Sequence, residues 1–271
     1  MRELNGAELA GFIKERQLKQ VRNLRQADGV VPRLLIIKSN TANPVIDTFV
    51  RMKQRYAEDV FIEVQIESLE ETAMSPRINQ ANLDPEIHGI IVQLPLSGSS
   101  ATDAILATIT PAKDVDGLGE TAEFPSATAE AIDWLLAGYN VELSGKRIAL
   151  LGQGRLVGKP LASMWRDRQY TVAVFDVDSG DIRESVRSSD VIVTATGVPG
   201  RLTSADVGEG AVVVDAGTAS ENGVLVGDAS EDLRMRDDIT ITPLQGGVGP
   251  LTIAVLFDHV IQSALRSVGK L

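Results

Sequence analysis

Acid and base chemistry in this chain falls to lysine, carboxylate, tyrosine and amide side chains. The sequence has no cysteine, and its two histidines, His88 and His259, lie far apart. General acid or base catalysis needs a group whose pKa lies near the working pH, and a partly desolvated lysine meets that need. Lys53 is the first candidate, because Phe49 precedes it by one helical turn and brings an aromatic ring beside the amine. Without such surroundings, a lysine on an amphipathic helix is only a solvated surface charge.

Three further segments carry polar groups or glycines that suit a binding site. Gln93 interrupts the apolar strand VQLPL, and a buried amide needs a partner, which a substrate, Lys53 or a neighbouring loop could supply. Asp116 belongs to the loop KDVDG, where two carboxylates and a lysine either grip a ligand or form a solvated turn. The segment GGVGP, residues 246–250, can lie flat against a planar ligand or simply turn tightly.

The segment RIALLGQGRLVGKP, residues 147–160, runs from an apolar strand through a glycine turn into a helix. Gly152 can adopt backbone angles that strain other residues, and Gly154 keeps side chains away from a pyrophosphate approaching the helix. Asp176 stands 24 positions after Gly152 (176 − 152), near the spacing at which an acidic residue binds a ribose diol. GQGRLVG is not the full GxGxxG pattern, but together with the strand, the helix and Asp176 it predicts a site for a redox cofactor.

The composition limits the class of protein. At 271 residues, the chain exceeds the usual domain length of roughly 100 to 200 residues and favours two domains. A net charge of −11 without any basic run argues against a nucleic-acid partner. No segment approaches the ~20 apolar residues of a membrane span, so we expect no membrane partner and a cytoplasmic location. We also expect no metal, because histidine and cysteine ligands are scarce.

Short apolar runs alternate with longer amphipathic stretches, which predicts an α/β fold of parallel sheets with crossover helices. The first half is expected to hold helices near 7–23, 45–58 and 70–82 and the strands RLLIIKS, VFIEVQI and GIIVQLPL. A helix near 128–137 leads to a linker, and the second half is expected to form a Rossmann-type doubly wound sheet from RIALL, TVAVFD, VIVTATG, AVVVDAG and ITITPL. The final helix is expected to return to the first domain. The predicted domains are therefore 1–138 with 251–271, an N-terminal α/β catalytic domain, and 139–250, the dinucleotide-binding domain.

Five segments, FVRMK, VQLPL, KDVDG, the GQGRLVGKP turn and ITPLQGGVGPLT, occur in an order and spacing that resembles the bifunctional methylenetetrahydrofolate dehydrogenase/methenyltetrahydrofolate cyclohydrolase family. The likeness covers essentially the whole chain, and VQLPL, KDVDG and GGVGPLT are its most specific parts. The resemblance implies oxidation of 5,10-methylenetetrahydrofolate with NAD or NADP and hydrolysis of the methenyl product to 10-formyltetrahydrofolate, within the one-carbon metabolism that feeds purine biosynthesis. It also implies a cleft between the two domains and a homodimer formed through the Rossmann domain.

The same resemblance implies a role for each candidate residue. Lys53 looks like the family's key lysine for the cyclohydrolase step, Gln93 would tune it by hydrogen bonding, and Asp116 would grip the amino-pyrimidine part of the pterin. The implied folate site is lined by Phe49, Lys53, Val92, Gln93, Leu94, Asp116, Gly246, Gly247, Val248, Gly249 and Pro250. The implied cofactor site is lined by Gly152, Gln153, Gly154, Arg155, Asp176, Val177, Asp178, Ser179 and Thr218.

Two departures from the family concern the lysine. Phe49 and Ile46 stand where the family usually has tyrosine and serine, so a hydroxyl beside Lys53 is lost. This loss predicts a weaker cyclohydrolase and leaves open an enzyme that is a dehydrogenase only. A non-catalytic folate-binding or nucleotide-binding protein is a further alternative. A Rossmann dehydrogenase for another substrate would leave VQLPL and KDVDG unexplained.

The remaining departures concern the cofactor. An arginine and a serine typical of the family's glycine turn are Gln153 and Gly154 here, and a histidine and a serine are replaced by Asp176 and Val177. Arginine and serine suit a 2′-phosphate, whereas Asp176 would repel it and accept a hydrogen bond from a free 2′-hydroxyl. We therefore predict a preference for NAD over NADP, with Arg155 as the side chain that could still turn toward a phosphate.

Overall fold

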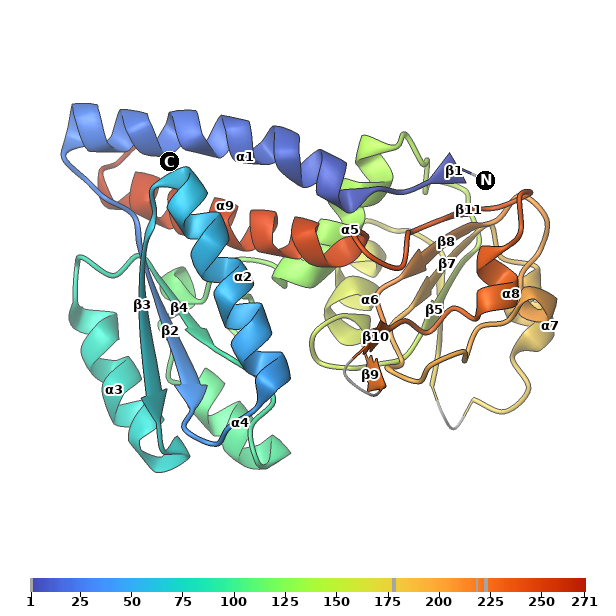
Figure 1. The fold of residues 1–271 in the computed structure, drawn as a ribbon, viewed down its shortest axis with the longest axis horizontal. Coiled ribbons are helices and arrows are strands. Elements are labelled where there is room, and N and C mark those ends of the chain that lie inside the picture. The colour runs from blue at the N-terminus through green and yellow to red at the C-terminus, as the bar shows by residue number, and fades with distance from the viewer. Residues whose placement is uncertain (1, 177–178, 218, 222–223) are drawn as a thin grey trace. The chain divides into compact units, whose positions relative to one another are not determined.

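The computed structural model describes residues 2–176, 179–217, 219–221 and 224–271, and it divides into two compact units (Figure 1). Unit 1 comprises Met1–Ala10 and Thr128–Thr252. Unit 2 comprises Gly11–Ala127 and Ile253–Leu271. Each unit has its own parallel sheet, as the alternation of apolar and amphipathic segments predicts.

Unit 2 is built on a three-stranded parallel sheet in the order β3-β2-β4. The central strand β2 and its neighbour β4 are buried, and residues of β2 and β4 pack with Met74 and Ile78 of a helix in one apolar core. The strands are Arg33–Ser39 (β2), Glu63–Leu69 (β3) and Gly89–Val92 (β4), and the helices between and after them are Pro44–Val60 (α2), Glu71–Leu83 (α3) and Ser99–Leu106 (α4). Neither the full length of β3 nor helix α4 is predicted by the apolar pattern.

Helix α2 carries the first candidate residue on its buried face. The Asn43 side chain accepts hydrogen bonds from the first amides of the helix, and Pro44 occupies its first turn. The helix ends at Phe61, whose φ of 59° is left-handed. The expected strand VFIEVQI therefore starts three residues too early, because Val60 and Phe61 close the helix and β3 begins at Glu63.

Unit 1 is built on a six-stranded parallel sheet in the order β1-β11-β8-β7-β5-β6. Its strands are Arg2–Glu3 (β1), Ile148–Leu151 (β5), Val172–Phe175 (β6), Val191–Thr194 (β7), Val212–Asp215 (β8) and Thr240–Ile241 (β11). From β5 the chain first adds β6 on one side of it and then crosses to add β7 on its other side. The direction in which strands are added therefore reverses between β5 and β7. In open α/β sheets, ligands bind beyond the carboxyl ends of the strands at such a switch point.

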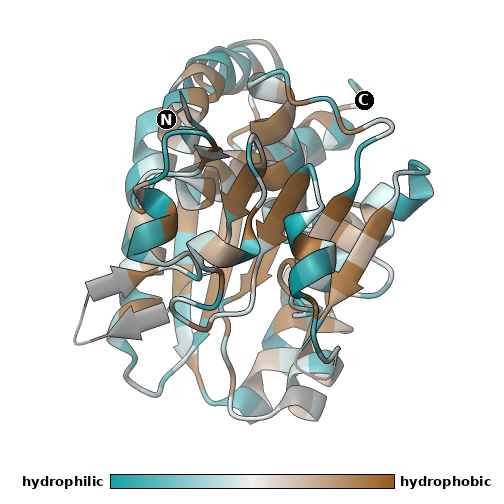
Figure 2. Ribbon diagram, turned by 90° about the vertical axis from the view of Figure 1, so that its right-hand side faces the viewer, coloured by the Kyte–Doolittle hydropathy of each residue, from teal (hydrophilic) through white to brown (hydrophobic). Residues whose placement is uncertain are grey.

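Several shorter elements complete unit 1. The helices Ala127–Gly138 (α5), Gly158–Asp167 (α6), Arg183–Arg187 (α7) and Glu231–Arg234 (α8) surround the sheet, and Ala219–Glu221 (β9) pairs with Val224–Val226 (β10) in an antiparallel ribbon. Strands β5 and β7 are buried along their whole length, and Figure 2 shows that the inner strands of the sheet are coloured mostly hydrophobic. The predicted Rossmann-type sheet is confirmed, whereas the ribbon and the N-terminal strand β1 are not foreseen by the sequence.

The final helix, α9 (Val248–Ser267), packs on unit 2 through its residues from Ile253 onward. Gln17 of α1 (Gly6–Asn23) donates to the Ala254 carbonyl over 2.7 Å, and the Tyr56 and Phe257 rings stack 5.2 Å apart. This confirms the predicted return of the last helix. Among the described residues, α9 alone is long and apolar enough to cross a membrane. However, 67% of its most apolar 18-residue segment is buried in the protein, as in a core helix.

Candidate active site

Lys53 and Gln93 meet in unit 2 although they lie on different elements. Lys53 is 8% exposed on the inner face of α2, and its Nζ donates to Gln93 Oε1 over 2.8 Å. Gln93 directly follows β4, and its backbone amide donates to the Ile37 carbonyl of β2 over 2.8 Å, so the sheet itself sets its position. The structure thus places an amine and an amide at the carboxyl end of a parallel strand.

The electrostatics of this pair depend on Asp116. Burial lowers the pKa of Lys53, and the negative charge of Asp116 opposes that shift by raising it. Burial in turn raises the pKa of Asp116, while Lys53 and His259 lower it. Lys53 and Asp116 therefore affect each other's pKa, and because burial is the larger effect, Lys53 releases its proton more readily than an ordinary lysine.

The three charged residues of the KDVDG loop have different roles: two of them stabilise the loop, and the third affects Lys53. Lys113 Nζ donates to the Ala81, Asn82 and Asp84 carbonyls at the end of α3. The buried Asp114 side chain accepts from the Gly117 and Gly119 amides over 3.0 and 2.7 Å. Gly117 has a φ of +66°, and a Cβ there would lie 2.2 Å from the Pro125 carbonyl oxygen, so the loop needs glycine. Lys113 and Asp114 therefore shape the loop, and Asp116 remains the residue coupled to Lys53.

His259 supports the same loop and is missed by the sequence analysis, which considered it only as a possible metal ligand. It is buried in α9, its Nδ1 lies 2.8 Å from the Val115 carbonyl oxygen, and its ring stacks on Phe124 at 4.7 Å. Val115 directly precedes Asp116 in the chain. A histidine that directly follows the apolar run of this helix and Asp258 is the signal that could have pointed to this buried contact.

The other predicted folate-site residues divide between the two units. In unit 2, Val92 is buried at the end of β4, Leu94 is partly buried and precedes Pro95 through a cis peptide bond, and Phe49 is partly buried one turn before Lys53. Residues 246–250 belong to unit 1. Val248, Gly249 and Pro250 form the first turn of α9, so the expectation of a GGVGP loop is wrong beyond Gly247, because proline is tolerated in the first turn of a helix.

The glycine turn of unit 1 is packed more tightly than its sequence suggests. Gly152 has a φ of +97°, and a Cβ there would lie 2.5 Å from the Ala195 carbonyl oxygen. Gly158, which the sequence analysis did not single out, opens α6, and a Cβ there would lie 2.0 Å from the Gly152 carbonyl oxygen. Gly154 has open space at the same point. Gly152 and Gly158 permit close packing of the strand and the helix, and Gly154 leaves room for a ligand at the start of the helix.

Beside this turn, polar side chains meet at the end of β6. Gln153 Nε2 donates to Asp176 Oδ2 over 2.9 Å, and the Ser179 hydroxyl donates to Asp176 Oδ1 over 3.2 Å. Arg155 is partly buried in the turn between Gly154 and α6. The predicted cofactor residues Val177, Asp178 and Thr218 lie outside the described residues. No cluster that could hold a metal ion is found among the side chains that the structure describes.

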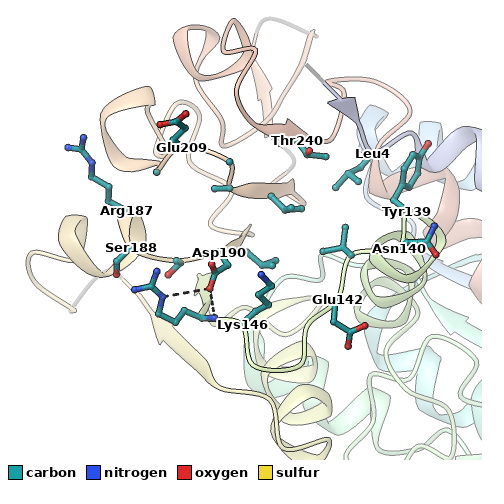
Figure 3. A pocket seen from close by; sticks show the side chains of 18 residues that line it. Leu4, Tyr139, Asn140, Glu142, Lys146, Arg187, Ser188, Asp190, Glu209 and Thr240 are labelled. Atoms are coloured by element: carbon teal, nitrogen blue, oxygen red, sulfur yellow. Dashed lines mark hydrogen bonds and ion pairs between the residues drawn. The ribbon is translucent and has the colours of Figure 1, made fainter.

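A cavity of about 400 Å³ in unit 1 is lined by none of these residues (Figure 3). It is lined by residues at the amino ends of the strands, among them Arg147 before β5, Asp190 before β7 and Thr240 in β11. Ligands of open α/β sheets bind at the opposite, carboxyl edge. The cavity therefore does not mark the active site.

Comparison with known proteins finds one family for both parts of the chain. Residues 4–116 match the tetrahydrofolate dehydrogenase/cyclohydrolase catalytic domain, and residues 126–268 match the NAD(P)-binding domain of the same name. The bifunctional protein FolD of Streptococcus pyogenes is 36% identical, in an alignment that covers 98% of this chain and 99% of that protein.

Solved structures of similar proteins show the same architecture. The bifunctional FolD methylenetetrahydrofolate dehydrogenase/cyclohydrolase of Campylobacter jejuni is 33% identical with a TM-score of 0.91, over 98% of this chain and 99% of that one. The FolD enzyme of Trypanosoma brucei, solved with NADP and an inhibitor, is 29% identical with a TM-score of 0.89, over 98% of this chain and 97% of that one. The fold of each unit is thus shared with enzymes whose names join the two activities.

Proposed function

The chain belongs to the tetrahydrofolate dehydrogenase/cyclohydrolase family, and from that premise we propose how its residues divide the work. It is a bifunctional enzyme, which oxidises 5,10-methylenetetrahydrofolate to the methenyl form with a nicotinamide cofactor and hydrolyses that product to 10-formyltetrahydrofolate. The observation that carries our assignment of roles is the 2.8 Å hydrogen bond between the buried Lys53 amine and Gln93.

Lys53 moves protons in the hydrolytic step. Water adds to the cationic methenyl carbon and loses one proton. The bond from that carbon to one folate nitrogen then breaks as this nitrogen gains a proton and the hydroxyl gives up its own proton to become the formyl oxygen, so that one proton is released overall. Burial increases the fraction of Lys53 that is uncharged and able to accept a proton. Gln93 Oε1 holds one Nζ hydrogen and so orients the nitrogen.

Asp116 binds the folate in this proposal. A carboxylate in partly buried surroundings is a strong acceptor for the amino and ring N–H groups of a pterin. Its position after Val115, whose carbonyl contacts His259, ties it to a rigid helix rather than to a free loop. The same carboxylate raises the pKa of Lys53, so substrate binding at Asp116 and proton transfer at Lys53 are linked.

The residues of unit 1 hold the nicotinamide cofactor, which when bound accepts the hydride from the methylene carbon. The open space at Gly154 and the amides at the start of α6 suit a pyrophosphate. Hydride transfer needs chiefly alignment of donor and acceptor, so the protein's main contribution is position. No side chain has to exchange a proton in this step.

The cofactor is NAD in our proposal, rather than NADP. Asp176 stands at the end of β6, where its carboxylate accepts from Gln153 over 2.9 Å and from Ser179 over 3.2 Å. A carboxylate at this position is an acceptor for the hydroxyls of a ribose. A 2′-phosphate would bring like charge against it. Steady-state kinetics with both cofactors test this proposal. We expect a higher kcat/KM with NAD, and a higher value with NADP would overturn it.

The catalytic roles are tested by replacing the amine. In Lys53→Met, hydrolysis of methenyltetrahydrofolate is expected to fall about 100-fold or more, the size of a lost general base, while the protein remains folded. Lys14→Met on the surface of α1 is the matched control. If the hydrolysis rate does not depend on Lys53, the proposed role of Lys53 in hydrolysis is wrong, and only the dehydrogenase activity remains for this site.

We further propose the functional domains 1–138 with 251–271 for folate and 139–250 for the cofactor, a cytoplasmic location, and a homodimer formed through the cofactor domain. Light scattering on the purified chain tests the last point. A mass near twice 29.0 kDa is expected, and a mass of one chain would exclude the dimer.

A further inference from the structure

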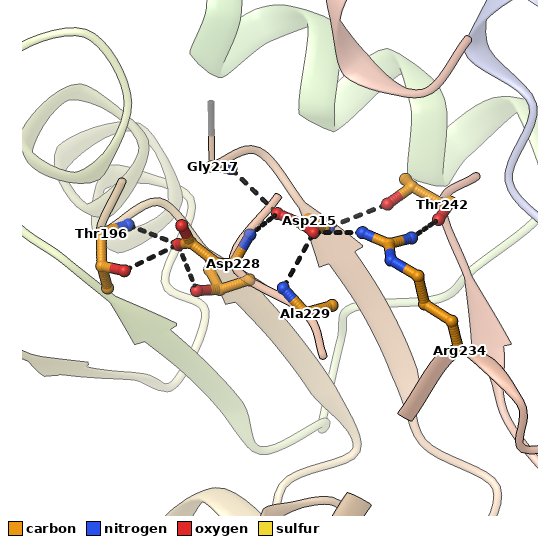
Figure 4. Close-up of polar contacts among 8 residues, drawn as sticks. Thr196, Asp215, Gly217, Asp228, Ala229, Arg234 and Thr242 are labelled. Atoms are coloured by element: carbon orange, nitrogen blue, oxygen red, sulfur yellow. Dashed lines mark hydrogen bonds and ion pairs between the residues drawn. The ribbon is translucent and has the colours of Figure 1, made fainter. Parts of the chain in front are cut away.

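Asp228 is a buried carboxylate that the assigned chemistry does not use. It is 1% exposed and lies shortly after strand β10. Figure 4 shows its polar contacts. Its Oδ2 accepts three hydrogen bonds, from the Thr194 hydroxyl over 2.7 Å, from the Thr196 amide over 2.6 Å and from the Thr196 hydroxyl over 2.9 Å. All three donors lie at the carboxyl end of β7. One carboxylate therefore holds the start of the loop that follows this strand.

That loop touches the glycine turn directly. The position of a Cβ on Gly152 would lie 2.5 Å from the Ala195 carbonyl oxygen and 3.2 Å from the Thr196 nitrogen. Gly152 therefore packs directly against the peptide group between Ala195 and Thr196. β5 and β7 are the two strands between which the order of the sheet reverses, so this contact lies at the switch point where a ligand is expected.

A second carboxylate connects Asp228 to the next strand. Asp215, at the end of β8, accepts from the Gly217, Asp228 and Ala229 amides over 3.0, 3.1 and 3.0 Å, and it pairs with Arg234. Arg234 also donates to the Thr242 carbonyl beyond β11 over 2.9 Å. The two aspartates therefore join the carboxyl ends of β7, β8 and β11 (Figure 4).

The two oxygens of Asp228 are treated differently. Oδ2 has three donors, whereas the buried Oδ1 has no hydrogen-bond partner among the residues that the structure describes. A Cβ on Gly217 would lie 2.0 Å from Oδ1, so Gly217 must be glycine for its chain to pass this oxygen. A buried carboxylate that leaves one oxygen without a donor costs stability, which argues that its place at the end of β7 serves more than the fold.

We propose that Asp228 is a positioning residue for the dehydrogenase reaction. By holding Thr196, it fixes the position of the Ala195–Thr196 peptide against Gly152, and thereby the position of the glycine turn that holds the cofactor. The inference rests on the proposed assignment of that turn to the cofactor. Asp228 acts through Thr196 and Gly152 and touches no reacting atom. Hydrolysis of the methenyl substrate needs no nicotinamide cofactor, so it reports on the fold without reporting on this alignment.

The experiment compares Asp228→Ala with Asp228→Asn. The alanine variant loses all three hydrogen bonds, and we expect its KM for the nicotinamide cofactor to rise about tenfold or more, as small misplacements in an active site do. The asparagine variant keeps one carbonyl oxygen that can accept from Thr194 and Thr196, and we expect it to restore most of the affinity. Cyclohydrolase kcat is expected to be unchanged in both variants.

Asp190→Ala is the matched control. Asp190 lies just before β7, at the opposite end of the same strand, and accepts from the Arg147 amide over 2.8 Å. Its loss should leave the cofactor KM unchanged. Equal cofactor KM in the alanine variant of Asp228 and in the wild type would overturn the inference, and so would equal losses of both activities in the two Asp228 variants.

Thr196→Val decides the question if Asp228→Ala does not fold. Valine removes one donor to Asp228 and keeps the backbone amide. We expect about a threefold rise in the cofactor KM, as for one hydrogen bond, with hydrolysis unchanged. An unchanged KM in this variant would overturn the inference. If the wild-type chain oxidised no methylenetetrahydrofolate with either cofactor, the assignment of function would fail instead.

Discussion

Lys53 lies on the buried face of α2, where desolvation favours its neutral form and Asp116 favours its charged form. These two effects oppose each other, and burial is the larger of them. A lysine on the solvated face of the same helix would have neither. The residue type allows proton transfer here, but the surroundings decide whether it occurs near neutral pH.

Asp116→Asn is expected to move the acid limb of the cyclohydrolase pH profile to lower pH. The neutral amide no longer raises the pKa of Lys53, so the amine becomes an available base at a lower pH. The measurement is kcat for methenyltetrahydrofolate hydrolysis across pH. Glu120→Gln, an exposed neighbour, is the control. A shift of the limb to higher pH would contradict the coupling between Asp116 and Lys53.

Phe49→Tyr is expected to increase the cyclohydrolase rate. A hydroxyl one turn from Lys53 would provide a hydrogen bond to the amine or to the attacking water, worth about 2- to 10-fold in rate. The dehydrogenase rate should not change, because hydride transfer needs no proton relay. Phe12→Tyr, at a position that is 65% exposed, is the matched control. No gain in hydrolysis would show that the missing hydroxyl does not limit this enzyme.

At the scale of elements, the strand–turn–helix unit β5–α6 depends on three glycines with different duties. Gly152 and Gly158 have backbone atoms where a Cβ would be, and Gly154 has none. The helix can start directly above the strand only because the first and last positions lack side chains. The middle position is free for a ligand.

Gly158→Ala and Gly154→Ala should therefore fail in different ways. In Gly158→Ala, α6 must move away from the Gly152 carbonyl, so we expect the free energy of unfolding to fall by about 1–3 kcal/mol, as for overpacking. In Gly154→Ala, we expect unchanged stability and a raised KM for the cofactor. Denaturant unfolding and steady-state kinetics measure the two effects. Equal loss of stability in both variants would contradict the separation of duties.

At the scale of the whole molecule, two parallel sheets carry the two halves of the chemistry. Lys53, Gln93 and Asp116 belong to unit 2, and the glycine turn with Asp176 belongs to unit 1. The end of α9 packs in unit 2 although its first turn belongs to unit 1. The first and last parts of the chain are thus shared between the units, and a cut between them cannot be made at one point in the sequence.

Cofactor binding is expected to stabilise the whole chain selectively. NAD at about 100 times its Kd should raise the free energy of unfolding by about 2.7 kcal/mol, because a ligand that binds only the folded state shifts the equilibrium by mass action. NADP at the same concentration should raise it less, since Asp176 opposes a 2′-phosphate. Thermal unfolding with each cofactor measures this without any assay of activity. An equal or larger shift with NADP would contradict the preference.

The sequence by itself determined the family and most of the strands and helices, whereas β1, α4 and the β9–β10 ribbon were not foreseen. The apolar runs predict where β2, β5, β7 and β8 lie, because a buried strand of a parallel sheet is largely apolar. The bounds of β2 are as predicted, whereas the runs predicted for β7 and β8 extend past the observed ends of these strands. The glycine turn was also recognisable, since its backbone angles require glycine at a known point after a strand. The family resemblance and the confirmed enzymatic function followed from short segments in order along the chain.

Only the tertiary structure decided which of these residues meet. Lys53 and Gln93 are 40 positions apart, Asp228 lies 34 positions from Thr194, and His259 lies 144 positions from Val115. Local sequence patterns indicate burial and backbone conformation, because these properties depend on the residues of a single segment. Hydrogen bonds between distant segments depend on how the helices and strands pack, and no periodicity in the sequence encodes that packing. For this reason the sequence predicted Lys53 and the glycine turn, and the buried carboxylate of Asp228 emerged only from the folded chain.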